Sequence, residues 1–173
     1  MNKVIGIMWA LAMAPILATA SGCEAAPRSA SAAPNPRGVE DPRRFVLETY
    51  QAFSLSAESM DWPEHSYSAR LARLFADYDG WTVAQDGLIG ELDFDWWVNA
   101  QDWGIADVSV SETVEAPRRR IETVRFLHGD RSDEIRLVFV REGSRWFLDD
   151  AIEGRGRDAD GWTLSTLLRA RPQ

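Results

Sequence analysis

Lysine, histidine and cysteine are scarce in this chain of 173 residues. Lys3 is the only lysine, and every later basic residue except two histidines is arginine. Acidic residues outnumber Lys and Arg by 27 to 19, giving a net charge of −8. We therefore expect no nucleic acid as a partner, because nucleic acid attracts basic surfaces. Arginine in place of lysine indicates GC-rich codon usage, since arginine's special value lies in bidentate or stacked contacts that a sequence does not reveal.

The single cysteine, Cys23, excludes an internal disulfide. Ahead of it, residues 4–20 form an apolar run with one proline, preceded by Lys3 and followed by small residues. This is the layout of a secretory signal. The run is marginal for a membrane span, which needs about 20 apolar residues, and no basic stop-transfer cluster follows it.

Two cleavage sites compete at the end of this run. Residues 18–20, Ala-Thr-Ala, have the form of an ordinary signal-peptidase site, whereas residues 20–23, Ala-Ser-Gly-Cys, resemble the lipobox of bacterial lipoproteins. Lipidation explains an odd thiol in an exported protein, so we predict a lipoprotein signal peptide at residues 1–22 and lipid attachment at Cys23. Each buried methylene adds about 0.8 kcal/mol, so several acyl chains hold a protein on a membrane. In families with this signal, a residue such as Glu24 after the cysteine implies the periplasmic face of the outer membrane.

Residues 23–40 are rich in Ala, Pro, Ser and Arg and contain almost no large apolar side chains. Such a segment cannot bury enough surface to offset chain entropy, so we predict a flexible tether. Residues 41–173 suit one folded domain, since 45% hydrophobic and 10% aromatic residues are ample for a core.

The first part of this domain has helical periodicity. Asp41-Pro42 is typical of a helix start, and the helix is predicted to run to about Phe53. A second helix is predicted from Ser66 or Ser68 to Gly80, followed by a connecting loop over residues 81–90. The apolar face expected for the two helices comprises Val46, Tyr50, Phe53, Tyr67, Leu71, Leu74, Phe75 and Tyr78.

After Gly104 the period changes to two residues. Strands are predicted at about residues 108–114, 121–128, 135–141 and 146–152, separated by short turns. Short connections favour an antiparallel meander, and its many apolar residues require helices on one face. A last helix carries Leu164, Leu167 and Leu168, with Thr163 or Asp160 as its cap. The fold class is therefore α+β: two or three N-terminal helices on a curved four-stranded antiparallel sheet, with a short C-terminal helix.

The stretch from Leu92 to Trp103 joins the two parts and mixes aromatic with acidic residues. The order of helices, this segment and a meander resembles the nuclear-transport-factor-2-like cone, also called cystatin-like or ketosteroid-isomerase-like. Phe94-Asp95, residues 98–103 (Val-Asn-Ala-Gln-Asp-Trp) and residues 143–152 also resemble a domain family of unknown function in bacterial envelope lipoproteins. The resemblance covers about residues 41–152, with Trp96 where the family commonly has proline, and implies no particular activity.

Candidate ligand-binding residues come from this stretch and from the final strand. They are Asp95, Asn99, Gln101, Asp102, Trp103 and Asp150. A calcium loop would need further oxygen ligands and a terminal Glu that are missing after Asp95, so we expect no metal and no cofactor. The alternative for Asn99 and Asp102 is that they tie a turn through backbone amides.

Asp149 and Asp150 point in opposite directions on a regular strand. Asp150 then shares a face with Trp146, Leu148 and Ile152, and a carboxylate in an apolar pocket has a raised pKa and can move protons. The simpler alternative is that Asp150 is a polar residue at the rim of the sheet. Other catalytic patterns are missing, including a Gly-x-Ser-x-Gly elbow and a glycine-rich phosphate loop.

Three functions remain open. The first is a non-catalytic, lipid-anchored envelope protein that binds a small apolar ligand or a periplasmic protein. The second is an acid-base isomerase or hydrolase that uses Asp150. The third is an immunity or inhibitor protein whose acidic surface covers a periplasmic toxin or hydrolase. The membrane is an expected partner through the lipid, and a homodimer is a further candidate.

Overall fold

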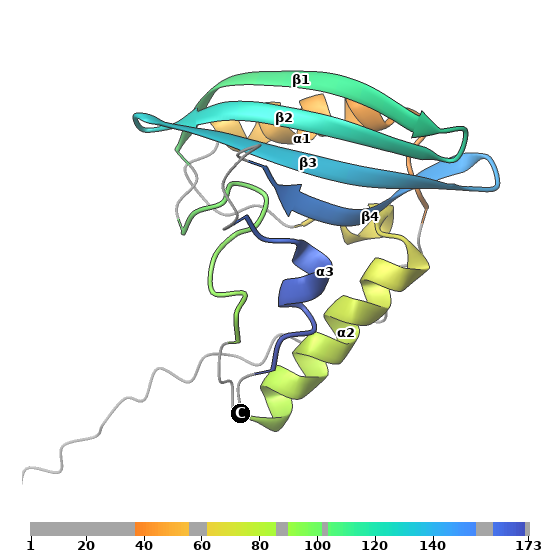
Figure 1. The fold of residues 1–173 in the computed structure, drawn as a ribbon, viewed down its shortest axis with the longest axis vertical. Coiled ribbons are helices and arrows are strands. Elements are labelled where there is room, and N and C mark those ends of the chain that lie inside the picture. The colour runs from red at the N-terminus through yellow and green to blue at the C-terminus, as the bar shows by residue number, and fades with distance from the viewer. Residues whose placement is uncertain (1–36, 56–61, 86–89, 102–103, 155–160, 172–173) are drawn as a thin grey trace, which may run out of the picture. The chain divides into compact units, whose positions relative to one another are not determined.

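The structure is a computed structural model that describes residues 37–55, 62–85, 90–101, 104–154 and 161–171. The predicted signal peptide, Cys23 and most of the predicted tether lie outside these residues. Four strands form one antiparallel sheet in chain order: β1 (Ile105–Ala116), β2 (Arg119–His128), β3 (Arg131–Glu142) and β4 (Arg145–Glu153). Figure 1 shows that the sheet is curved. The predicted α+β fold is confirmed, with helices before the strands and a short helix after them.

Helix α1 (Pro42–Leu55) begins where the sequence predicts. The Asp41 carboxylate accepts a hydrogen bond from the Arg44 amide at 3.3 Å, which satisfies one of the free amides of the first turn. Val46, Tyr50 and Phe53 are buried, as the helical spacing indicated. The helix packs on β1 and β2, behind the sheet in the view of Figure 1.

Helix α2 (Ala69–Ala84) follows a single 3-10 turn, η1 (Glu64–Ser66). Ser68 is its cap, and the Ser68 hydroxyl accepts the Leu71 amide at 3.0 Å. The predicted end at Gly80 is wrong, since the helix continues to Ala84. A glycine inside a helix costs only about 1 kcal/mol, and the Trp81 ring, one residue on, packs 5.9 Å from that of Tyr78.

Only the start of α2 contacts the sheet. Helix α2 packs on β4 there and then runs away from the strands. The expectation that both early helices cover one face of the sheet therefore holds along the length of α1 but not of α2.

Trp96 and Trp97 connect the two helices at the centre of the core. Both are fully buried, and their rings stack with centroids 4.5 Å apart. The Trp97 ring meets Tyr50 of α1 at 6.0 Å, whereas that of Trp96 lies 6.4 Å from Phe75 of α2. Aromatic pairs at such distances add about 0.5–1.5 kcal/mol beyond burial, so this dipeptide ties together parts of the chain that are distant in sequence.

The outer edge of β4 is covered by three short pairings. Val39 pairs with Trp146, Tyr67 with Leu148, and Thr163 with Ile152. Val39 is buried, so ordered structure begins within the segment that the sequence assigned to the tether. Thr163 precedes the short helix α3 (Leu164–Leu167), as predicted.

A bulge in β4 corrects the predicted direction of Asp150. Leu148 pairs with Phe139 but Asp150 pairs with Val138, so Asp149 is an extra residue in the strand. The bulge reverses the alternation, because neighbouring residues of β3 point to opposite faces. Asp150 therefore does not share a face with Leu148. Ala151, fully buried, takes that place.

Candidate functional site

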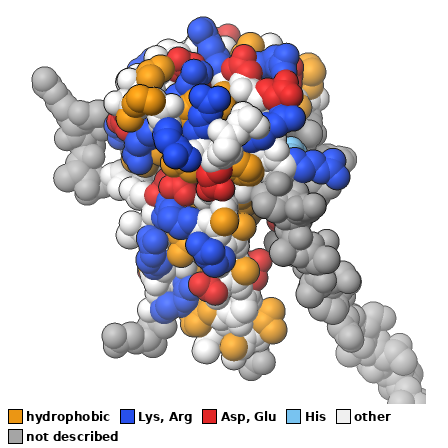
Figure 2. Space-filling model, turned by 90° about the vertical axis from the view of Figure 1, so that its right-hand side faces the viewer, with side chains coloured by type: hydrophobic (Ala, Val, Ile, Leu, Met, Phe, Trp, Pro, Cys, Tyr) orange, Lys and Arg blue, Asp and Glu red, His pale blue; other side chains and the backbone are white. Residues whose placement is uncertain are grey.

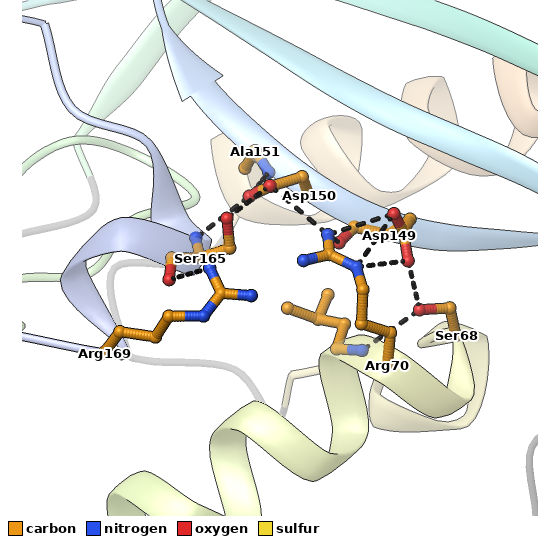
Figure 3. A network of polar contacts seen from close by, with 8 residues as sticks. Ser68, Arg70, Asp149, Asp150, Ala151, Ser165 and Arg169 are labelled. Carbon is orange, nitrogen blue, oxygen red and sulfur yellow. Dashed lines mark hydrogen bonds and ion pairs between the residues drawn. The ribbon is translucent and has the colours of Figure 1, made fainter.

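Asp149 and Asp150 lie where β4 meets the start of α2 and α3. Figure 3 shows Arg70 of α2 between the two carboxylates. Asp149 accepts hydrogen bonds from the Ser68 hydroxyl at 2.6 Å and from Arg70 Nε at 3.0 Å, and the Asp149 carbonyl accepts Arg70 Nη2. Although burial raises the pKa of Asp149, the bonds from Arg70 and Ser68 hold it below its ordinary value.

The Asp150 carboxylate accepts hydrogen bonds on the other side of this junction. Its Oδ1 accepts the amides of Ala151 and Ser165, both at 3.0 Å. Its Oδ2 accepts the Ser165 hydroxyl at 2.6 Å and Arg70 Nη2 at 3.3 Å. Four donors saturate a carboxylate, so the geometry fits a cross-tie between β4, α2 and α3 better than a group that transfers protons.

Asp95 closes a tight loop that positions the two core tryptophans. The Asp95 and Ala100 backbones pair, and Asn99 between them has φ of 52°, a left-handed conformation that Asn tolerates well. Asp95 Oδ1 accepts the Trp97 amide at 2.9 Å, and Oδ2 accepts Trp62 Nε1 at 3.2 Å. Burial raises the pKa of Asp95, and these two hydrogen bonds oppose the rise.

Asn99 links this loop to the far end of the sheet. Its amide nitrogen donates to Asp133 Oδ1 at 3.2 Å and to Glu153 Oε1 at 3.1 Å, and its amide oxygen accepts Trp162 Nε1 at 2.8 Å. Arg131 Nε donates to the other Asp133 oxygen at 2.7 Å. The alternative prediction, that Asn99 ties a turn through backbone amides, is wrong for its side chain, because these three contacts are with side chains distant in sequence.

The predicted site residues therefore divide between two places. Asp95 and Asn99 belong to the loop, whereas Asp150 belongs to the α2–β4–α3 junction, and no hydrogen bond between described residues joins them. Gln101 is exposed, and Asp102 and Trp103 lie outside the described residues. The structure does not assemble these residues into one pocket within the described ranges.

Glu122 of β2 is the acidic residue that the sequence reasoning missed. Its side chain is fully buried, and neither carboxylate oxygen has a hydrogen-bond partner among the described residues. Burial raises the pKa of Glu122 from 4.5 to about 7, and the nearby charge of Glu112 adds to the rise. The guanidinium groups of Arg120 and Arg43 oppose it without cancelling it.

A signal for Glu122 was present in the sequence. Glu122 lies two residues before Val124 and four before Phe126 in a strand, so the period of two places it on the buried face. A charged residue at an inward position of an alternating strand is a candidate site, and this pattern distinguishes Glu122 from the consecutive aspartates of β4.

Two partly exposed side chains, Glu112 and Arg120, lie beside the buried Glu122. Glu112 lies directly opposite on β1, and Arg120 Nη1 binds Glu112 Oε2 at 3.0 Å. The Arg120 guanidinium also lies 4.7 Å from the Trp146 ring centroid. Figure 2 views this end of the sheet, where arginine and carboxylate side chains intermingle.

A groove of about 230 Å³ opens beside the start of α1. Charged side chains line much of it, including Glu40, Asp41, Arg44, Glu48 and Arg145. An apolar ligand would leave these charges desolvated, so the groove does not suit one.

Compared with known proteins, the chain matches no family model, no curated protein and no solved structure. The resemblance to the envelope lipoprotein family and to the nuclear-transport-factor-2-like cone therefore stays a prediction. Within the described ranges, no three His, Cys, Asp or Glu side chains are grouped so that they could hold a metal ion. No helix of that part of the chain is long and apolar enough to cross a bilayer.

Proposed function

We propose that this chain is a non-catalytic, lipid-anchored envelope protein whose folded domain binds an extended segment of a basic periplasmic protein. The observation that carries the proposal is the contrast between the two edges of the sheet. The outer edge of β4 is covered at Trp146, Leu148 and Ile152, whereas no backbone pairing from the described residues reaches the outer edge of β1. An uncovered edge strand is a template for strand addition.

The form of β1 supports this mode of binding. Register shifts at residues 106–109 and 114–116 bracket a regular run from Ser109 to Val114. Six residues are enough for a short added strand, and Val114 is 57% exposed. Edge strands are often protected by bulges, and here the stretch between the bulges has no strand paired to its outer edge, where Arg43 Nη2 of α1 donates to the Val110 carbonyl at 3.4 Å.

Charge favours a basic partner. Strand β1 carries Asp107, Glu112 and Glu115 and no basic residue of its own, and Arg120 and Arg119 of β2 form ion pairs with the two glutamates. The whole chain has a net charge of −8, which steers a basic protein toward it. An inhibitor that covers a basic toxin or hydrolase is one form of this function, and its binding weakens at high salt.

The interior favours a protein partner over a small apolar ligand. The largest fully buried side chains include Trp96, Trp97, Tyr50 and Tyr67, which fill the space between sheet and helices. The saturated contacts of Asp150 likewise argue against the acid-base enzyme that would use it.

The test begins with a photo-crosslinking residue at Ser111 of the full lipidated protein in its native envelope. The crosslinked partner is identified, purified and mixed with the protein, and amide hydrogen exchange is measured along β1. Strand addition protects every second amide between Ser109 and Val114, because alternate amides point away from β2. Protection on another surface, or crosslinks only to a second copy of the chain, would contradict the proposal.

A pair of variants sharpens this test. Val114→Lys places a charge on the edge and repels a basic strand, so we expect at least a tenfold weaker complex, about 1.4 kcal/mol. Leu55→Lys also introduces a lysine, at the end of α1, where the side chain is 89% exposed. This variant should leave the affinity for the partner unchanged. Equal affinities of the two variants would exclude the β1 edge.

A further inference from the structure

We propose that Glu122, with Glu112 beside it, binds a cationic group that carries several N–H donors, such as a primary ammonium or a guanidinium. The site lies on the face of the sheet that α1 covers, near the start of that helix. It shares Glu112 with β1, but it lies on the face of the sheet and not along the outer edge, and it does not rest on the function proposed for that edge.

The first support is an unsatisfied carboxylate. Both Glu122 oxygens are buried without a hydrogen-bond partner in the described structure. Folded proteins rarely leave a buried charged group unpaired, and such exceptions call for a missing ion, water or ligand. A cation with N–H donors supplies both the charge and the hydrogen bonds that the carboxylate lacks.

The second support is the arrangement of like charges. Glu112 and Glu122 are direct cross-strand partners, and like charges in this relation repel. Arg120 is the nearest strand cation, but its guanidinium hydrogen-bonds to Glu112 and lies over the Trp146 ring. A second cation between the two carboxylates would relieve the repulsion between Glu112 and Glu122 that remains in the presence of Arg120.

Charged groups of neighbouring elements surround Glu122. From α1, Arg43 and Asp41 act on Glu122 with opposite signs, and β1 contributes Glu112. The β3 residue opposite Glu122 is Leu137, which is apolar.

Movement of two neighbouring side chains would expose Glu122, which is fully buried. The Arg120 and Glu112 side chains beside Glu122 are 32% and 28% exposed. Long, partly exposed side chains change rotamer within nanoseconds, so a small cation can reach Glu122 without opening the sheet.

The experiment uses the full protein in detergent with methylguanidinium and n-butylammonium as probes. Carboxyl carbon resonances of glutamate are followed by NMR, and the Glu122 signal is assigned with Glu122→Gln. We expect both probes to shift the Glu122 signal. Affinity should rise about 30-fold from pH 5.5 to pH 8, because a carboxyl with a pKa of about 7 ionises over that range.

Three controls make the outcome decisive. Glu122→Gln should bind at least tenfold more weakly and lose the pH dependence, whereas Glu115→Gln, at an arginine-paired glutamate of β1, should bind as the parent does. Tetramethylammonium has charge but no N–H donor and should not shift the Glu122 signal. The proposal is overturned if Glu122→Gln binds like the parent, if tetramethylammonium binds as well as the other probes, or if the Glu122 signal never moves.

Discussion

Asp150 and Glu122 carry the same chemical group in opposite surroundings. Asp150 accepts hydrogen bonds from Arg70, from Ser165 and from the Ala151 amide, so its charge is fully solvated by the protein. Glu122 is buried without a hydrogen-bond partner in the described structure. Hydrogen bonds therefore leave Glu122, and not Asp150, with acceptor oxygens that a ligand could use.

At Glu122 we predict a pH-dependent stability. The pKa is 4.5 in an unfolded chain and about 7 in the fold, so the unfolded chain releases its proton first as pH rises. Folding stability then falls by about 3 kcal/mol between pH 4.5 and pH 7, is unaffected by this group below that range and stays constant above it. Urea unfolding from pH 4 to pH 8 measures the effect.

Glu122→Gln is the matched comparison, since its amide does not titrate. The difference in unfolding free energy between the two proteins should change by about 3 kcal/mol across the same range, in favour of the variant at high pH. A constant difference would show that Glu122 titrates normally.

At Arg70 we predict a loss of stability on truncation. Arg70→Ala leaves Asp149 and Asp150 close together without the guanidinium between them, at side-chain exposures of 17% and 15%. We expect the free energy of unfolding to drop by about 1–3 kcal/mol, as for a hydrogen-bonded charge that loses its partner. Thermal unfolding at pH 7 provides the measurement.

Arg44→Ala is the control for Arg70. Arg44 forms an i,i+4 pair with Glu48 on the surface of α1, and both side chains are more than 60% exposed. Its loss should change stability by less than about 0.5 kcal/mol. If Arg70→Ala and Arg44→Ala change the free energy of unfolding equally, the junction of α2, β4 and α3 does not depend on Arg70.

Among the elements, the helices and the sheet edges depend on different interactions. Helix α1 is held by an apolar face on β1 and β2, whereas α2 leaves the sheet and packs through Phe75 on Trp62 and Trp96. Helix α2 can therefore tolerate a glycine in its interior, since tertiary packing outweighs local propensity.

Within α2 we predict that Gly80→Ala raises stability by about 0.5–1 kcal/mol. Apart from the neighbouring residues and backbone of α2 itself, no heavy atom of the described structure lies within 4 Å of the added methyl group, and alanine reduces the entropy of the unfolded chain. Chemical denaturation and helical circular dichroism measure the gain. A loss of stability would mean that Gly80 has a role that its surroundings do not reveal.

Gly38→Ala should have the opposite effect. Gly38 has φ of +58°, and an added Cβ would lie 2.7 Å from Cζ of Phe147. We expect a loss of more than about 1 kcal/mol, because left-handed backbone and steric overlap both oppose alanine. Comparing the two variants distinguishes a glycine that only lowers helix propensity from one that the backbone conformation and close packing require.

For the whole molecule, the net charge and the predicted lipid anchor lead to two further expectations. A net charge of −8 makes association with a basic partner sensitive to salt.

At Cys23 we predict that substitution by alanine removes the lipid anchor. Cys23→Ala should move the protein from the membrane fraction to the soluble envelope fraction, because the thiol that carries the acyl chains is lost. Metabolic labelling with a fatty-acid analogue followed by fractionation tests this. Unlabelled Cys23 in the parent protein would instead favour the signal-peptidase site at residues 18–20.

Periodicity determined the elements of this fold. Val46, Tyr50 and Phe53 are buried as their spacing predicted, Ser68 caps α2, and four strands follow in chain order. These features depend on contacts between residues close in sequence or on a regular alternation, which a single sequence displays directly. The apolar run at residues 4–20 and the single cysteine, Cys23, predict an anchored envelope protein, and that stays a prediction.

Tertiary structure alone decided the candidate site. The bulge at Asp149 depends on pairing with β3, and it reversed the direction predicted for Asp150. Whether a carboxylate is saturated depends on donors far away in sequence: Arg70 and Ser165 reach Asp150, and no donor among the described residues reaches Glu122. The sequence showed which residues are acidic, but burial and hydrogen bonding set their chemistry, and both arise only when distant segments pack together.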